Sequence, residues 1–265
     1  MTMETETSIP KRGFFSLIWG MIRHPLGTLQ YLRDQGGRLW LLVALIAVVM
    51  TILPIAFSAP ITSRLAQEAF QTQLDRMEQE GASQNFTPEM QGQVSQFATN
   101  PLFTVVFPSF TGLIGLVLGW LIWAGALHLL SVMIGGNSQF SRMWAAVIWA
   151  SIPFVLRNLL QSVYILVSGQ TISNPGLSGL VADTRSVSEL ISAPPSASRL
   201  ALQTFLGQID IFTLWNLALL VAGVIVMARL SRRKAILVTL GIWIIFLAFR
   251  ILLAASSSIF ASGIA

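Results

Sequence analysis

The most regular pattern along the chain is a series of five apolar stretches separated by polar connections. A helix needs about 20 mostly apolar residues to cross a hydrocarbon core about 30 Å thick, and each stretch reaches that length. The predicted spans are residues 39–58, 105–130, 143–167, 212–230 and 235–260, the second having apolar neighbours that leave its ends open. We therefore predict an all-α membrane protein with a five-transmembrane-helix bundle.

Residues 1–38 precede the first span as a separate N-terminal segment. Apolar residues 14–22 predict a short helix, Pro25 interrupts it, and leucines at a spacing of three continue the pattern. We expect an interfacial helix pair on the cytoplasmic face, serving as a simple juxtamembrane anchor in preference to a dedicated lipid or partner site. Three arginines of this pair are placed near lipid headgroups: Arg23, Arg33 and Arg38.

Two long connections separate the spans. In residues 59–104, Pro60 marks a plausible helix start, and Thr87 with Pro88 is typical of a helix N-cap and first position. We expect a helical hairpin that covers the outer ends of the bundle, in preference to a partner-binding lobe. Residues 168–211 are rich in Ser, Gly and Pro, and we expect this connection to be flexible in part.

Composition narrows the class of protein. Of 265 residues, 54% are hydrophobic and 10% are charged, and the mean hydropathy is +0.71. A soluble domain is usually about 25% charged, so these values exclude a water-soluble globule. The absence of cysteine excludes disulfides, thiolate metal sites and cysteine nucleophiles.

The formal charge of +5 does not indicate nucleic-acid binding here, because in a membrane protein the placement of the basic residues matters more than their sum. Because successive spans cross the membrane in alternating directions, three basic sites fall on the same side of it. They are the N-terminal segment, Arg142, and the junction formed by Arg229, Arg232, Arg233 and Lys234. Cytoplasmic flanks carry the excess of Lys and Arg. We therefore expect a cytoplasmic N-terminus and an outer tail at residues 261–265.

Charged residues inside a span are functional candidates by default, because they are costly in hydrocarbon. Arg157 and Arg250 lie about 21 and 22 Å above the inner ends of their spans, at 1.5 Å per residue. Asp210 lies at the outer rim of the fourth span and Asn216 about 6 Å below it, so the four could meet at one level. Two guanidiniums facing one carboxylate suit an anionic lipid headgroup. The simpler interpretation is that each arginine reaches the headgroup region or pairs structurally with Asp210.

Small residues at a spacing of four predict close helix packing. Gly115 and Gly119 form a GxxxG pattern in the second span, and Ala218 and Ala222 repeat the spacing in the fourth. Packing within the monomer and dimerisation both explain this pattern.

Pro108 and Pro153 predict kinks at the start of the second span and within the third. His128 is expected to be a hydrogen-bonded packing residue, because no second His or carboxylate in its span supports a metal site. Hydrolase, metalloprotease and nucleotide-binding motifs are missing. We therefore expect no catalytic residue, no metal and no cofactor.

Several short motifs together resemble those of the Yip family of five-span membrane proteins, in its bacterial type. They are His24-Pro25 with Gly27-Thr28-Leu29, Gly135-Gly136 with Phe140, the third span with Pro153, Phe212-Thr213-Leu214-Trp215-Asn216-Leu217, and the basic turn Arg229–Lys234. The resemblance implies a multi-pass helical bundle with a cytoplasmic N-terminus, located in the bacterial cytoplasmic (inner) membrane. Eukaryotic relatives are associated with Rab-type GTPases and vesicle traffic. The Asp-Leu-Tyr-Gly-Pro pattern of those members is absent, so that role is not carried over.

Two functions remain open on this basis. The first, implied by the family, is a non-enzymatic scaffold or adaptor in membrane organisation or trafficking-like processes, with the bilayer and a protein partner at the cytoplasmic face. The second is a small transporter or lipid-handling protein that uses the arginine level as its polar site. The predicted ligand is an anionic lipid, and self-association is a further option.

Overall fold

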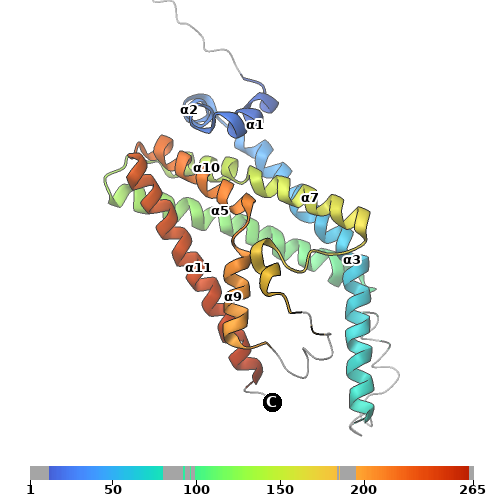
Figure 1. The fold of residues 1–265 in the computed structure, drawn as a ribbon. Helices are drawn as coiled ribbons and strands as arrows, with labels where there is room; N and C mark the ends of the chain where they lie inside the picture. Colours follow the sequence, from blue (N-terminus) through green and yellow to red (C-terminus); the bar gives the residue numbers. More distant parts are fainter. Residues whose placement is uncertain are drawn as a thin grey trace, which may run out of the picture.

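The computed structural model describes residues 12–79, 92, 96, 99–183, 185 and 195–262. These residues form helices and connecting turns, with no strand among them (Figure 1). The elements are α1 (Phe14–Arg23), α2 (Pro25–Gln35), α3 (Trp40–Gln79), the π-helix η2 (Leu102–Val106), α5 (Phe107–Met133), α6 (Phe140–Ala150), α7 (Ile152–Ser168), the 3-10 helix η3 (Gly176–Val181), α9 (Ala197–Gly207), α10 (Ile211–Ala228) and α11 (Arg232–Ser262).

Five helical stretches of the described chain are long and apolar enough to cross a membrane, and each corresponds to one predicted span. They are Trp40–Asp75, Leu102–Met133, Phe140–Ser168, Ile211–Ala228 and Arg232–Ser256. The prediction of an all-helical protein with five apolar spans is therefore confirmed. The second stretch is longer than predicted at both ends, where flanking apolar residues left its limits open.

The prediction of a helix start at Pro60 is wrong. Pro60 lies inside α3, which continues for 40 residues without a break and is about 60 Å long at 1.5 Å per residue. The hydroxyls that follow the proline bond to carbonyls of their own helix: Thr62 donates to the carbonyl of Ser58 at 3.2 Å, and Ser63 to that of Pro60 at 3.1 Å. Proline is tolerated inside membrane helices, which is why it did not mark a helix start here. The second helix predicted in this connection, at Thr87 and Pro88, lies outside the described residues.

The two prolines predicted to cause kinks both lie where the helix type or continuity changes. Pro108 is the second residue of α5, directly after the π-helical turn η2. Pro153 occupies the second position of α7, and the third span is broken at Ser151 into α6 and α7. Proline lacks an N–H and its ring clashes with the carbonyl four residues earlier, so the helix cannot continue through this point with its normal hydrogen bonds.

Helices α6 and α10 form the centre of the bundle. Ile148, Trp149 and Val224 are almost completely buried there, and α6 and α10 contact each other along their lengths. By contrast, α3, α5 and α11 leave many large apolar side chains exposed. A helix that is apolar on all sides is typical of a membrane span.

Helices α1 and α2 cover one end of this centre. Leu17, Met21 and Leu29 are completely buried, the ring of Phe14 lies 6.1 Å from that of Trp149, and α2 contacts α10. The helix pair predicted in the N-terminal segment is therefore present, with Pro25 at the start of α2.

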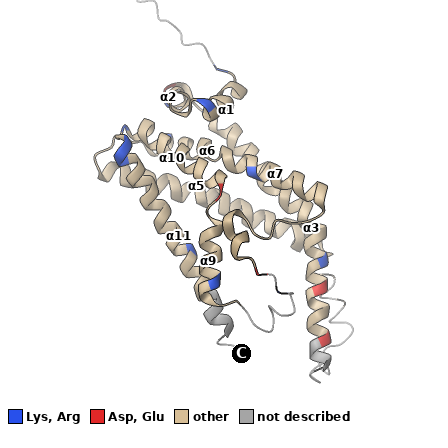
Figure 2. Ribbon diagram, in the orientation of Figure 1, with Lys and Arg blue, Asp and Glu red and all other residues tan. Residues whose placement is uncertain are grey.

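The basic sites predicted to share one side lie at this same end of the bundle (Figure 2). Arg33 donates to the carbonyl of Val226 at 3.3 Å, and Lys234 donates to that of Ile134 at 2.9 Å. The adjacent Arg33 guanidinium lowers the pKa of Asp34, and Arg142 and Arg229 add smaller contributions in the same direction. Helix α2, the α5–α6 turn and the α10–α11 turn are distant in sequence but lie close together here. Their basic residues therefore gather at the end of the bundle that α1 and α2 cover.

The described residues of the connection after α7 include two helical elements. They are η3 and the helix α9, whose N-cap Ser196 accepts from the backbone N–H of Arg199 at 3.4 Å. Helix α9 packs against α11 and η3. Gly176 has a φ of +60°, and a Cβ there would lie 2.8 Å from the carbonyl oxygen of Ile209, so only glycine fits this turn.

Candidate functional site

Three adjoining cavities lie among the helices at the level of Arg157. The arginine cavity, about 450 Å³, is lined by Arg157 and Arg250 together with residues of α5, α10 and α11. The amide cavity, about 520 Å³, lies between α3 and α7 and is lined by Asn158 and Gln161. The inner cavity, about 230 Å³, is lined mostly by apolar residues of α3, α5, α6, α7 and α10. Phe154 lines all three.

Arg157 stands on α7, and its guanidinium has two partners. One is the ring of Phe154, whose centroid lies 4.9 Å away. The other is Asp210, whose Oδ2 is 3.4 Å from Nη1, while the Arg157 side chain remains 42% exposed. This long contact leaves much of the guanidinium fork available for a further anion.

Asp210 is engaged twice, because it also caps α10. Its Oδ1 accepts from the backbone N–H of Thr213 at 2.7 Å, and its Oδ2 accepts from the Thr213 hydroxyl at 3.1 Å. An N-cap carboxylate satisfies an N–H that has no partner inside the helix. The negative charge of Asp210 is therefore shared between the helix end and Arg157.

Arg250 stands on α11 and has a neutral partner. Its Nη1 donates to Oε1 of Gln208 at 2.8 Å. The side chain is exposed, and the adjacent Phe249 is 60% exposed on the apolar outer face of the same helix. A guanidinium in this setting gains a hydrogen bond from Gln208 but no neutralising charge.

The arginine cavity thus has an excess of positive charge. Two guanidiniums line it, and no acidic residue does; the carboxylate nearest in the hydrogen-bond network is Asp210, behind Arg157. Aromatic side chains form much of the remaining wall, with the rings of Trp123 and Phe246 5.1 Å apart and edge to face. This combination suits an anion that carries an apolar portion.

Asn216 lines the arginine and inner cavities, but its amide is occupied. Nδ2 donates to the backbone carbonyl of Ala150 at 2.7 Å. At the break in the third span, the N–H of Phe154 bonds to Ser151 at 2.9 Å and not to Ala150, four residues back. Asn216 therefore completes the hydrogen bonding of a broken helix as well as facing the cavities.

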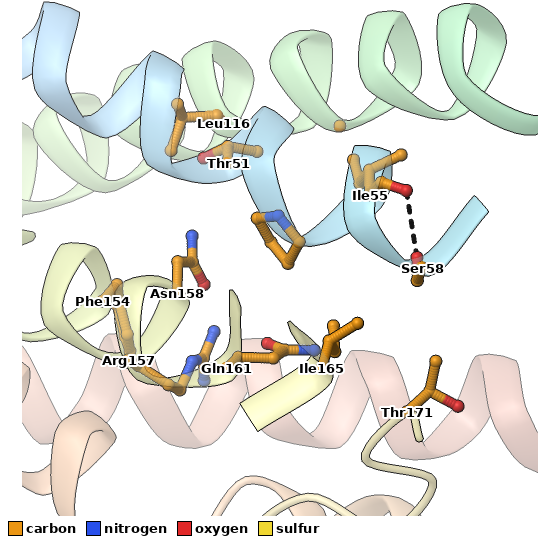
Figure 3. Close-up of a pocket in the computed structure, with 12 residues that line it drawn as sticks. Thr51, Ile55, Ser58, Leu116, Phe154, Arg157, Asn158, Gln161, Ile165 and Thr171 are labelled. Carbon is orange, nitrogen blue, oxygen red and sulfur yellow. Dashed lines mark hydrogen bonds between the residues drawn. The ribbon is translucent and has the colours of Figure 1, made fainter. Parts of the chain in front are cut away.

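Two carboxamides of α7 line the amide cavity (Figure 3). The Asn158 side chain points toward α3, the Gln161 side chain extends toward Ile165, and neither has a side-chain hydrogen bond among the described residues. The hydroxyls of Thr51 and Ser58, in contrast, donate to carbonyls of their own helix at 2.7 and 3.1 Å. The two carboxamides, with the Thr171 hydroxyl and the Arg157 guanidinium, are thus the polar groups of this wall that can bind a ligand.

The predicted packing role of Gly115 and Gly119 is not found within the monomer. A Cβ added at either position would meet no atom within 4 Å, and both glycines line the inner cavity. The close approach occurs instead at Gly223, where a Cβ would lie 3.3 Å from that of Ala146. Of the alanines named with the glycines, Ala222 is buried and Ala218 is exposed.

Sequence reasoning missed three polar residues at this level: Gln208, Asn158 and Gln161. A signal existed for Gln161, because it follows Arg157 by four positions and so shares its face of the helix. Nothing local pointed to Gln208, whose contact with Arg250 joins residues 42 positions apart. His128 is hydrogen-bonded, as predicted, with Nδ1 3.0 Å from the Ser138 hydroxyl. Within the described chain, no three His, Cys, Asp or Glu side chains gather in a way that could hold a metal.

The family of the chain follows from its similarity to known protein families. A family model for the Yip1 domain matches residues 19–253. The chain belongs to the Yip1 domain family. The matched Yip1 domain begins in α1, ends in α11 and contains the three cavities together with the basic end. No curated protein and no solved structure matches the chain.

Proposed function

We propose that this protein is a non-enzymatic, lipid-handling membrane protein that binds an anionic lipid headgroup between Arg157 and Arg250. One observation carries the proposal: both guanidiniums line a single cavity that has no acidic residue in its wall. A cavity that reaches both arginines favours the lipid-handling function over a purely structural role for these residues.

The cost of charge in hydrocarbon supports an anionic ligand. A guanidinium inside a membrane span is unfavourable by several kcal/mol unless it is paired or reaches the headgroups. A phosphate accepts paired hydrogen bonds from a guanidinium and supplies the missing charge. Ile122 and Phe249 line the same cavity and are 52% and 60% exposed, so the rim is apolar and compatible with lipid chains.

The experiment is native mass spectrometry of the protein gently extracted from its own membrane. We expect retained anionic lipid in the wild type and a loss of about tenfold or more in Arg157→Leu and Arg250→Leu, because each change removes a charge-assisted contact. Arg64→Leu is the matched control, since Arg64 is exposed on α3 and lines none of the three cavities. Equal lipid retention in all four proteins, or none in the wild type, contradicts the proposal.

A second candidate is supported by the basic end of the bundle: a scaffold or adaptor in membrane organisation, as family membership implies. There α1 buries Leu17 and Met21 but exposes Phe15 at 83% and Trp19 at 55%. The guanidinium of Arg23 lies 4.6 Å from the Trp19 ring. An apolar face with adjacent arginines fits an interfacial helix on an anionic cytoplasmic leaflet, or a docking face for a protein partner.

The absence of cysteine makes the orientation and the interfacial position directly testable. A single cysteine at Phe15 can carry an environment-sensitive fluorophore, and quenching by spin-labelled lipid reports its depth. We expect a shallow membrane depth and labelling from the cytoplasmic side in bacterial membranes. A fully aqueous label, or labelling from the opposite side, is incompatible with an interfacial α1 and a cytoplasmic N-terminus.

A further inference from the structure

We infer that the amide cavity binds an uncharged, hydroxyl-bearing headgroup substituent, so that the preferred ligand is a phosphodiester lipid with a polyol headgroup. The inference rests on the proposed function, because the phosphate of the same lipid would lie at Arg157 and Arg250. It goes further by assigning the part of the headgroup beyond the phosphate to Asn158 and Gln161.

Unused hydrogen-bonding capacity is the first argument. The Asn158 and Gln161 carboxamides border a space of about 520 Å³ and have no side-chain partner in the described part of the chain. A carboxamide both donates and accepts, as does a hydroxyl group. Both residues are half-buried, and a polyol would supply hydrogen-bond partners to both carboxamides.

The charge of the amide cavity is the second argument. Arg157 is the single charged residue in its wall, and the other polar members are hydroxyls and carboxamides. A headgroup with an ammonium group would find no carboxylate in this wall. A headgroup with a carboxylate in addition to its phosphate would find no second cation there. Neutral hydroxyls meet neither cost.

The position of Arg157 between two cavities is the third argument. Arg157 lines both the arginine cavity and the amide cavity, and Gln161 lies one turn further toward the C-terminal end of α7. A phosphate bound at Arg157 would therefore place the adjoining headgroup substituent beside the amide cavity, as the polyol adjoins the phosphate in a lipid.

The test compares two lipids of equal charge in phosphatidylcholine nanodiscs: phosphatidylglycerol, which has hydroxyls beyond the phosphate, and phosphatidylmethanol, which has none. We expect the wild type to prefer phosphatidylglycerol by about tenfold, the value for two neutral hydrogen bonds. The double variant Asn158→Leu with Gln161→Met should lose the preference while still binding phosphatidylmethanol, which shows that it is folded. Ser162→Ala is the control, because Ser162 is a buried α7 residue that bonds to its own helix.

The outcomes separate the inference from the proposed function. Equal wild-type binding of both anionic lipids, dependent on Arg157, overturns the inference and leaves the proposed function standing. No anionic preference at all overturns both. Soluble glycerophosphoglycerol serves as a competitor: displacement at millimolar concentration shows that the headgroup alone is bound, and failure to displace shows that the lipid chains are required. Both competition results support the polyol assignment when the preference is present.

Discussion

The side-chain amide of Asn216 on α10 donates to the backbone carbonyl of Ala150, 2.7 Å away, at the break between α6 and α7. Asn216 is 8% exposed and Ala150 is completely buried, so water does not easily replace this bond. The contact ties the most buried of the five apolar stretches, Ile211–Ala228, to the break in the third span. It also holds Ser151 and Phe154, which line the cavities, in place.

The first prediction concerns this bond. Asn216→Leu keeps the size of the side chain but leaves a buried carbonyl without its donor, which costs about 1–3 kcal/mol. We expect a corresponding fall in the unfolding midpoint in a detergent-stability or SDS titration. Asn158→Leu makes the same chemical change at a carboxamide without a side-chain partner and should have little effect. Equal falls in the unfolding midpoint of the two variants would show that the hydrogen bond to Ala150 does not contribute to stability.

The second prediction separates the two roles of Asp210. Asp210→Asn removes the charge facing Arg157 but retains a good N-cap, whereas Asp210→Ala removes both. We expect the alanine variant to be less stable than the asparagine variant by about 1 kcal/mol.

A double-mutant cycle that combines Asp210→Asn with Arg157→Leu then measures the coupling energy of the Arg157–Asp210 ion pair. Its coupling energy should be only about 0.2–1 kcal/mol, the value for a weak ion pair, because the contact is 3.4 Å long and the Asp210 carboxylate is also bonded to Thr213. A much larger coupling would identify Arg157 as a structural residue and weaken its assignment to ligand binding.

The third prediction is a pH dependence of the segment that precedes α10. Hydrogen bonds from Arg185, with the charges of Arg185 and Arg199, lower the pKa of Asp183 from 3.8 to about 2. A depressed carboxylate pKa means that these ion pairs contribute stability above about pH 4 and lose it as the pH falls through about 2.

A nitroxide attached to a cysteine at Leu180, which is 78% exposed, reports the mobility of this segment. We expect its motion to increase between about pH 4 and about pH 2. Asp183→Asn should give the mobile spectrum at every pH. A spectrum that does not change with pH in the wild type is the contrary result.

The fourth prediction concerns the turn between α10 and α11. Arg229 has a φ of +54° and is the sole non-glycine with positive φ among the described residues. This conformation costs an ordinary residue about 1–2 kcal/mol. Arg229→Gly should therefore be more stable than Arg229→Ala by about 1 kcal/mol in the same unfolding assay. Both variants lose the same charge, so their difference isolates the backbone effect, and equal stability would contradict it.

The five spans could be predicted from the sequence because the information is local. Runs of apolar residues such as 212–230 specify a helix in lipid wherever the rest of the chain lies. Pro25 and Pro153 mark breaks for an equally local reason, since each lacks a backbone N–H. Local information was ambiguous at Pro60, because a proline is compatible both with a helix start and with the interior of a membrane helix.

The candidate site could be predicted only as a level in the membrane. Helical rise placed Arg157, Arg250, Asp210 and Asn216 at similar depth, and the structure brings all four into one neighbourhood. The rise per residue gives the depth of a side chain but not the rotation of its helix or the position of that helix in the membrane plane. The sequence therefore did not show which partners the four residues have.

The sequence by itself determined the membrane character, the number of spans and the clustering of basic residues, because hydrophobicity and charge act residue by residue. The tertiary structure alone decided that Asn216 bonds to Ala150, that Gln208 meets Arg250, and that Gly115 and Gly119 border a cavity. Those contacts depend on how each helix is turned about its axis and which helices become neighbours. That arrangement is set by the packing of all the helices at once.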